Sequence, residues 1–126
     1  MRAVDTNVLV RLATRDDARQ TSAAEAFVSA GAWISQIVLV EAMWVLASVY
    51  ELGPEKIATA VEMFLSHANL TIQDADAVAG ALKHFQDRPA LGFSDCLILE
   101  VARKAGHTPL GTFDGKLSKL PGAQKL

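Results

Sequence analysis

"MRAVDTNVLVRL" (residues 1–12) sets a short apolar run directly before Asp5-Thr6-Asn7, after which the apolar pattern resumes. The first run has the length and composition of a strand, and "VLVRL" can begin a helix. Asp5 therefore falls where a strand is followed by a helix. Two interpretations stay open at this point. Asp5 caps the helix by accepting backbone N–H groups, or it serves a ligand, because open α/β sheets bind ligands at the carboxyl ends of their strands.

The rest of the chain repeats this alternation of short strand candidates and longer helical patterns. The strand candidates are residues 2–5, 32–34, 70–72 and 108–111. Apolar residues at helical spacing lie between them, as in Ile57, Ala60, Val61, Phe64 and Leu65. Strands that alternate with helices predict an α/β fold with a mostly parallel sheet covered by helices. The length of 126 residues suits a single domain.

Local signals mark the ends of several predicted helices. Ser35 is an expected N-cap for the apolar stretch that follows it, and Ser94 is another for the stretch 95–105. Pro54 suits the first turn of a helix, where its missing N–H has no cost. Gly106 suits the C-terminal end of a helix.

The composition restricts the class of protein. Hydrophobic residues make up 51% of the chain, more than one small core needs, which favours a subunit or partner interface. No apolar run is long enough for a transmembrane helix, no signal peptide is recognisable, and we expect a cytoplasmic protein without a membrane partner. The single cysteine, Cys96, lies in an apolar helical pattern and reads as a buried, inert thiol. A net charge of −2 does not suggest a nucleic-acid-binding protein and does not exclude one.

Glu41 stands in the middle of a stretch, residues 35–50, that is apolar nearly all round. On a helix its neighbours at three and four residues are apolar: Ile37, Val38, Trp44 and Val45. An unpaired charge buried on such a face would cost several kcal/mol, or the group would take up a proton. Three explanations stay open: a buried ion pair, a protonated acid, or a ligand to a cation.

Two further carboxylates stand at junctions between elements. Asp95 falls in the first turn of a predicted helix, where it also interacts favourably with the helix dipole. Asp114 follows the last strand candidate, in an Asp-Gly pair that is common in turns. A parallel sheet can bring Asp5, Asp95 and Asp114 to one edge, and Glu41 can point at the same edge. Carboxylates in one pocket repel each other unless positive charge holds them, and oxygen ligands select Mg²⁺ or Mn²⁺.

Four stretches, taken in order, resemble the acidic motifs of PIN-domain proteins, and are most similar to the small VapC-type ribonuclease toxins of toxin–antitoxin pairs. They are "DTNVLVRL", the Glu of "VLVEAMWVL", "FSDCLILEVA" and "TFDGKL". The resemblance implies an α/β/α sandwich, a Mg²⁺- or Mn²⁺-dependent endoribonuclease, a homodimer and a cognate antitoxin. It also implies that Asp5, Glu41, Asp95 and Asp114 form the acidic site, with Asn7 and Thr112 in supporting positions.

The chemistry that follows is hydrolysis of an RNA phosphodiester by metal-activated water, which leaves a 5′-phosphate and a 3′-hydroxyl. Two other classes remain to be weighed. A non-catalytic module with the same fold would use its apolar surface to hold a partner. A receiver-type signalling domain also has an acidic pocket, but it needs an acidic pair after its first strand and a late lysine, and this chain has Asp-Thr-Asn and Thr-Phe-Asp at those places. Whether one or two metal ions bind stays open.

Overall fold

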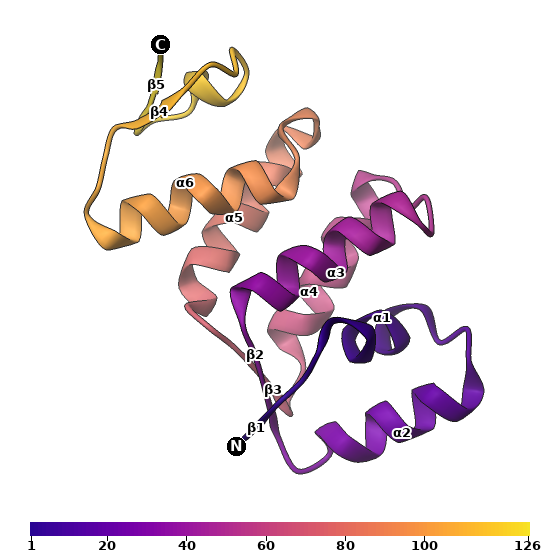
Figure 1. The fold of residues 1–126 in the computed structure, drawn as a ribbon. Coiled ribbons are helices and arrows are strands. Elements are labelled where there is room, and N and C mark those ends of the chain that lie inside the picture. Colours follow the sequence, from indigo (N-terminus) through magenta and orange to yellow (C-terminus); the bar gives the residue numbers. More distant parts are fainter. The chain divides into compact units, whose positions relative to one another are not determined.

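The computed structural model describes residues 1–126. The chain forms two compact units, Met1–Ala75 and Asp76–Leu126, called here the first and the second unit. Figure 1 traces both along the chain, and each is described below by itself. No helix in either unit combines the length and the apolar character that a bilayer span requires.

The first unit contains a three-stranded parallel sheet and four helices. In chain order the elements are β1 (Arg2–Ala3), α1 (Thr6–Thr14), α2 (Ala18–Val28), β2 (Ala32–Ile34), α3 (Gln36–Ser48), α4 (Pro54–Ser66) and β3 (Leu70–Ile72). The strand order is β1-β2-β3, with β2 in the centre. Two helices connect each pair of neighbouring strands, which agrees with the predicted α/β class and parallel sheet.

The predicted helix signals in the first unit are confirmed. Asp5 is the N-cap of α1, in extended backbone, and its Oδ1 accepts from the Thr6 N–H at 2.7 Å. Ser35 is the N-cap of α3, and its hydroxyl accepts from the Val38 N–H at 3.1 Å. Pro54 is the first residue of α4. Two side-chain caps and one proline at the first helical position therefore mark where these three helices begin.

The core of the first unit lies under one face of each helix. Its largest fully buried side chains are Leu9, Val10, Ile34, Leu39, Leu46, Val61 and Phe64. Helix α1 packs against both α2 and α3 (Figure 1). Helix α2 was not singled out in the sequence, because its buried residues Thr21, Ala24 and Val28 are small and form a weak apolar pattern. Helix α2 is therefore held by packing against α1, which its own weak apolar pattern does not predict.

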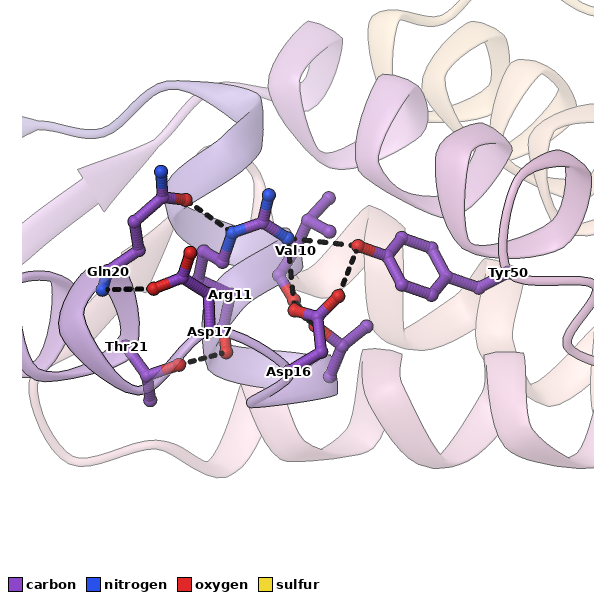
Figure 2. A network of polar contacts seen from close by, with 8 residues as sticks. Val10, Arg11, Asp16, Asp17, Gln20, Thr21 and Tyr50 are labelled. Carbon is purple, nitrogen blue, oxygen red and sulfur yellow. Dashed lines mark hydrogen bonds and ion pairs between the residues drawn. The ribbon is translucent and has the colours of Figure 1, made fainter.

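A polar network joins the C-terminal end of α1 to α2 and to the end of α3 (Figure 2). The Arg11 guanidinium donates to Gln20 Oε1 at 2.5 Å, to Asp16 Oδ1 at 3.1 Å and to the Tyr50 hydroxyl at 2.9 Å. Tyr50 in turn donates to Asp16 Oδ2 at 2.9 Å. Hydrogen bonds from Thr14 and then Tyr50 hold the pKa of the Asp16 carboxyl below its ordinary value.

Replacement of Tyr50 by phenylalanine tests this network. The variant loses one donor to Asp16 and one acceptor for Arg11, so its melting temperature at neutral pH is expected to fall by a few degrees at most, because the ion pair is partly exposed. A carboxyl with a lowered pKa stabilises the fold above its unfolded-state pKa and loses that effect as the pH falls. The deficit of Tyr50→Phe should therefore shrink in acid; a deficit that grows as pH falls would contradict this account.

The second unit contains two α-helices, two short 3₁₀ helices and a two-stranded sheet. Its elements are α5 (Ala75–Asp87), η1 (Pro89–Leu91), α6 (Phe93–Ala105), β4 (Leu110–Thr112), η2 (Leu117–Lys119) and β5 (Ala123–Lys125). β4 and β5 lie side by side (Figure 1) and pair in parallel. Their register sets Thr112 opposite Lys125. The predicted strand at 108–111 is therefore confirmed with a small shift, but its partner β5 was not predicted, because "AQK" carries no apolar pattern.

One predicted cap in the second unit is wrong. Helix α6 begins at Phe93, and its N-cap is Gly92 rather than Ser94. Gly92 has φ +80, a backbone conformation that glycine adopts without strain, and this lets the chain enter the helix early enough to bury Phe93. The predicted end of the helix is confirmed, since Gly106 closes α6 in the left-handed conformation.

The core of the second unit is built by α5 and α6. The Phe85 and Phe93 rings meet edge to face, with centroids 6.2 Å apart. Cys96 is fully buried, and burial raises the pKa of its thiol to about 11, which confirms the expectation of an inert cysteine. His84 Nε2 lies 2.6 Å from Glu100 Oε1, so this histidine has a partner within the second unit.

Candidate active site

Asp5 lies in the first unit at the carboxyl end of β1, where α1 begins. Its Oδ1 is engaged by the Thr6 N–H, while its Oδ2 has no hydrogen-bond partner within the chain. The side chain is exposed, as is that of Asn7 in the first turn of α1. The capping interpretation of Asp5 is thus confirmed, and one carboxylate oxygen is left over for a ligand.

Glu41 lies in the second turn of α3, in the same unit. The expectation that its charge is buried among apolar residues is wrong: Glu41 is exposed, and its neighbours Ile37 and Trp44 are exposed at 80% and 65%. The buried face of α3 consists instead of Leu39, Ala42, Met43 and Leu46. Because the Glu41 side chain is exposed, its charge stays in contact with water and needs no buried partner. No hydrogen bond or ion pair involves its carboxylate, which is free to bind a cation.

Asp95 lies in the first turn of α6, as predicted. It is half-buried and accepts no hydrogen bond. Burial, together with the charge of Asp114, raises the pKa of the Asp95 carboxyl above its ordinary value. The surroundings therefore oppose ionisation of Asp95 more than water does, and a cation bound beside it would offset this effect.

Asp114 lies in the loop that follows β4, and its own hydrogen bonds define that loop. Its Oδ1 accepts from the Lys116 N–H at 2.8 Å and from the Leu117 N–H at 3.2 Å, while its backbone N–H donates to Thr112 Oγ1 at 3.0 Å. These contacts confirm the predicted Asp-Gly turn, whereas the supporting role of Thr112 stays a prediction. Asp114 Oδ2 has no partner and remains available. Phe113, between Thr112 and Asp114, was not predicted as a functional residue.

The four acidic residues fall into two pairs. Asp5 and Glu41 belong to the first unit, and Asp95 and Asp114 belong to the second. Within the second unit the charge of Asp114 acts on Asp95, so these two carboxyls are neighbours. Neither unit by itself brings three or more His, Cys, Asp or Glu side chains together as a metal site. The donor atoms are all carboxylate oxygens with at least one oxygen unengaged on each residue, a set that fits Mg²⁺ or Mn²⁺.

A separate pocket of about 600 Å³ lies in the first unit, at the ends of α1 and α3 and along α4. Its lining includes Leu12, Asp16, Tyr50, Lys56 and Met63. None of the four acidic residues lines it. The candidate chemistry of this chain therefore lies outside the pocket.

Membership of a family follows from comparison with known proteins. The family model of the PIN domain matches residues 2–123, which include both units, and the chain belongs to this family. This confirms the predicted PIN-like α/β fold and sets aside the receiver-type interpretation.

Among solved structures, the chain is similar to VapC20 of Mycobacterium tuberculosis, described as a toxin that cleaves the sarcin–ricin loop. The identity is 23%, the match covers 98% of each chain, and the TM-score is 0.44. No curated protein matches the chain significantly.

Asp95→Asn is expected to stabilise the metal-free protein at neutral pH. Because the pKa of Asp95 is raised in the folded state, its ionisation opposes folding, and stability falls as the pH rises through the interval between the unfolded and the folded pKa. An amide removes this effect, so the melting temperature of the variant should exceed that of the wild type at neutral pH and match it below about pH 4.

Asp76→Asn provides a contrast of opposite sign in the same unit. A hydrogen bond from Lys104 lowers the pKa of Asp76, so its ionised form stabilises the fold, and the amide should lower the melting temperature at neutral pH. Thermal melts in chelator across the acid range measure both variants. Destabilisation by Asp95→Asn at neutral pH would contradict the electrostatic account of the Asp95–Asp114 pair.

Proposed function

We propose that this protein is a Mg²⁺- or Mn²⁺-dependent endoribonuclease of the VapC type, acting in the cytoplasm as the toxin of a toxin–antitoxin pair. The observation that carries the proposal is membership of the PIN-domain family over residues 2–123, with acidic residues at all four positions where the motifs place them. An all-oxygen donor set is suited to hard cations and to phosphodiester chemistry.

The proposed ligands are the four acidic residues of the motifs, Asp5, Glu41, Asp95 and Asp114. A bound divalent cation supplies Lewis-acid polarisation of a phosphate and lowers the pKa of a water molecule. The protein's part is orientation. Thr112 accepts from the Asp114 N–H, and the backbone N–H groups of Lys116 and Leu117 restrain Asp114 Oδ1, so that Oδ2 is the oxygen presented outward.

Asp5 is restrained in a comparable way. Its Oδ1 accepts from the Thr6 N–H, so its rotamer is set by the start of α1 and its Oδ2 remains available. Asn7 lies in the first turn of the same helix, and in its proposed supporting role it would orient a carboxylate or a water molecule. Burial and the charge of Asp114 raise the pKa of the Asp95 carboxyl, and a cation bound beside it would favour the ionised form.

A protein partner is proposed from the exposed apolar residues of α3. Ile37 and Trp44 of α3, and Val49 at its C-terminal end, are exposed at 80%, 65% and 65%. Large exposed apolar side chains on one element favour an interaction surface. We propose that an antitoxin or a second copy of the chain covers them. A Trp44 side chain that stays exposed in the assembled toxin–antitoxin complex would contradict this part of the proposal.

Cleavage of RNA by the purified chain, freed of antitoxin, tests the function. Total cellular RNA is incubated with Mn²⁺ or Mg²⁺, or with excess chelator, and the fragment ends are determined. The proposal predicts discrete fragments with 5′-phosphate and 3′-hydroxyl ends, formed only with metal. Cyclic phosphate ends, or fragments that persist in chelator, would contradict it. A folded protein that binds metal but cuts no RNA would favour the non-catalytic binding module.

A further inference from the structure

Phe113 is the most exposed aromatic side chain beside the candidate active site. It lies between Thr112 and Asp114 and is 80% exposed, although a phenyl ring gains much free energy by burial. Its loop is well defined, because Thr112 and Asp114 form the three hydrogen bonds described above. The ring is therefore presented to solvent by an ordered loop, next to a proposed metal ligand.

Three lysines lie in the same segment as Phe113. Lys116, Lys119 and Lys125 are all exposed, and no carboxylate pairs with any of them. The β4–β5 register sets Lys125 directly opposite Thr112. The Lys125 ammonium group lies beside the Asp114-Gly115 turn. Its Nζ is 3.6 Å from the position that a Cβ atom would take at Gly115. Residues 115–126 contain no Asp or Glu, so this segment carries an excess of positive charge although the net charge of the chain is −2.

An exposed ring beside unpaired lysines is complementary to single-stranded nucleic acid. Aromatic side chains stack on unpaired bases, and lysines neutralise the phosphates on either side. We infer that Phe113 and Lys125, with Lys116 and Lys119, form an RNA-binding surface on which an unpaired base stacks on Phe113 next to Asp114. This inference rests on the proposed nuclease function, since it names how the substrate of that site is held.

Binding of RNA without cleavage tests the inference. The probe is a fluorescein-labelled single-stranded RNA of mixed sequence, about 12 nucleotides long, which spans a typical site, and its anisotropy is measured in chelator. Phe113→Ala should weaken binding by about tenfold, because one base loses its stacking partner, while Phe113→Tyr should bind as the wild type does. Lys125→Ala should weaken binding and reduce the slope of affinity against salt by about one.

Two control variants remove comparable groups elsewhere. Val101→Ala deletes an exposed apolar side chain of α6, and Lys56→Ala deletes an exposed lysine of α4; both should leave RNA affinity unchanged. Affinity of Phe113→Ala within about twofold of wild type would overturn the inference, as would a wild type that does not bind the probe. A Phe113→Ala variant that loses self-association but keeps RNA affinity would assign the ring to a contact between two copies and would also overturn it.

The same proteins separate this inference from the proposed function. Adding Mn²⁺ after the binding measurement starts any cleavage. RNA binding that depends on Phe113, followed by no cleavage, would contradict the nuclease and leave the RNA-binding surface intact. Normal cleavage by a wild type whose RNA affinity does not depend on Phe113 would contradict the surface and leave the nuclease intact.

Discussion

Asp95→Asn is expected to lower metal-dependent RNA cleavage by about 100-fold or more, because it removes a proposed ligand charge from the site. The variant should fold, since the raised pKa of Asp95 means that the native surroundings accept a neutral group at this position. Loss of activity would therefore reflect loss of the carboxylate rather than loss of structure. Single-turnover cleavage at saturating enzyme, with Mn²⁺ varied, measures the effect.

The matched control for this prediction is Asp87→Asn. Asp87 is an exposed carboxylate at the end of α5 in the same unit, and it is not among the four acidic positions. Its amide variant should cleave RNA at the wild-type rate. Wild-type cleavage by Asp95→Asn, or an equal loss in both variants, would remove Asp95 from the proposed ligand set.

Phe64→Ala is expected to lower the free energy of unfolding by about 3–5 kcal/mol, the usual cost of emptying a buried phenylalanine site. Phe64 is fully buried on α4 and is the largest of the fully buried side chains. Equilibrium urea denaturation followed by far-UV circular dichroism measures the change. A small domain has few large buried side chains. This substitution should therefore lower the free energy of unfolding more than most others in the first unit.

Leu65→Ala supplies the comparison, since Leu65 is the next residue on α4 and is only half-buried. Its loss should be clearly smaller than that of Phe64→Ala, because less apolar surface returns to water. Equal losses at the two positions, or a loss at Phe64 below about 1 kcal/mol, would contradict the assignment of Phe64 to the core.

Local signals in the sequence predicted several helix ends correctly. Ser35, Pro54 and Gly106 each act within one turn of a helix, through a hydroxyl acceptor, a fixed φ or a permitted positive φ, and all three were predicted correctly. The prediction of Ser94 as an N-cap was wrong because Gly92, two residues earlier, already turns the chain into α6. β5 was missed because its existence depends on pairing with β4, which no local pattern of "AQK" reveals.

The candidate site was predicted less evenly. Asp95 and Asp114 were expected as neighbours, and the raised pKa of Asp95 agrees with that expectation. Glu41 was expected to be buried because α3 is apolar nearly all round, but such a pattern does not reveal which face of the helix the core covers. Phe113 was overlooked because one aromatic residue carries no periodicity, and only its exposure in the structure makes it conspicuous.

The central proposal is that Asp95 and Asp114, neighbouring carboxylates of the second unit, bind the same divalent cation. Mn²⁺ affinity, measured by calorimetric titration of the wild type, Asp95→Asn, Asp114→Asn and the double variant, tests it most directly. Ligands that share one ion act as a unit, so each single variant should lose about tenfold or more in affinity, and the double variant should lose much less than the product of the two. Wild-type affinity in either single variant, or fully independent losses in the double variant, would contradict the claim.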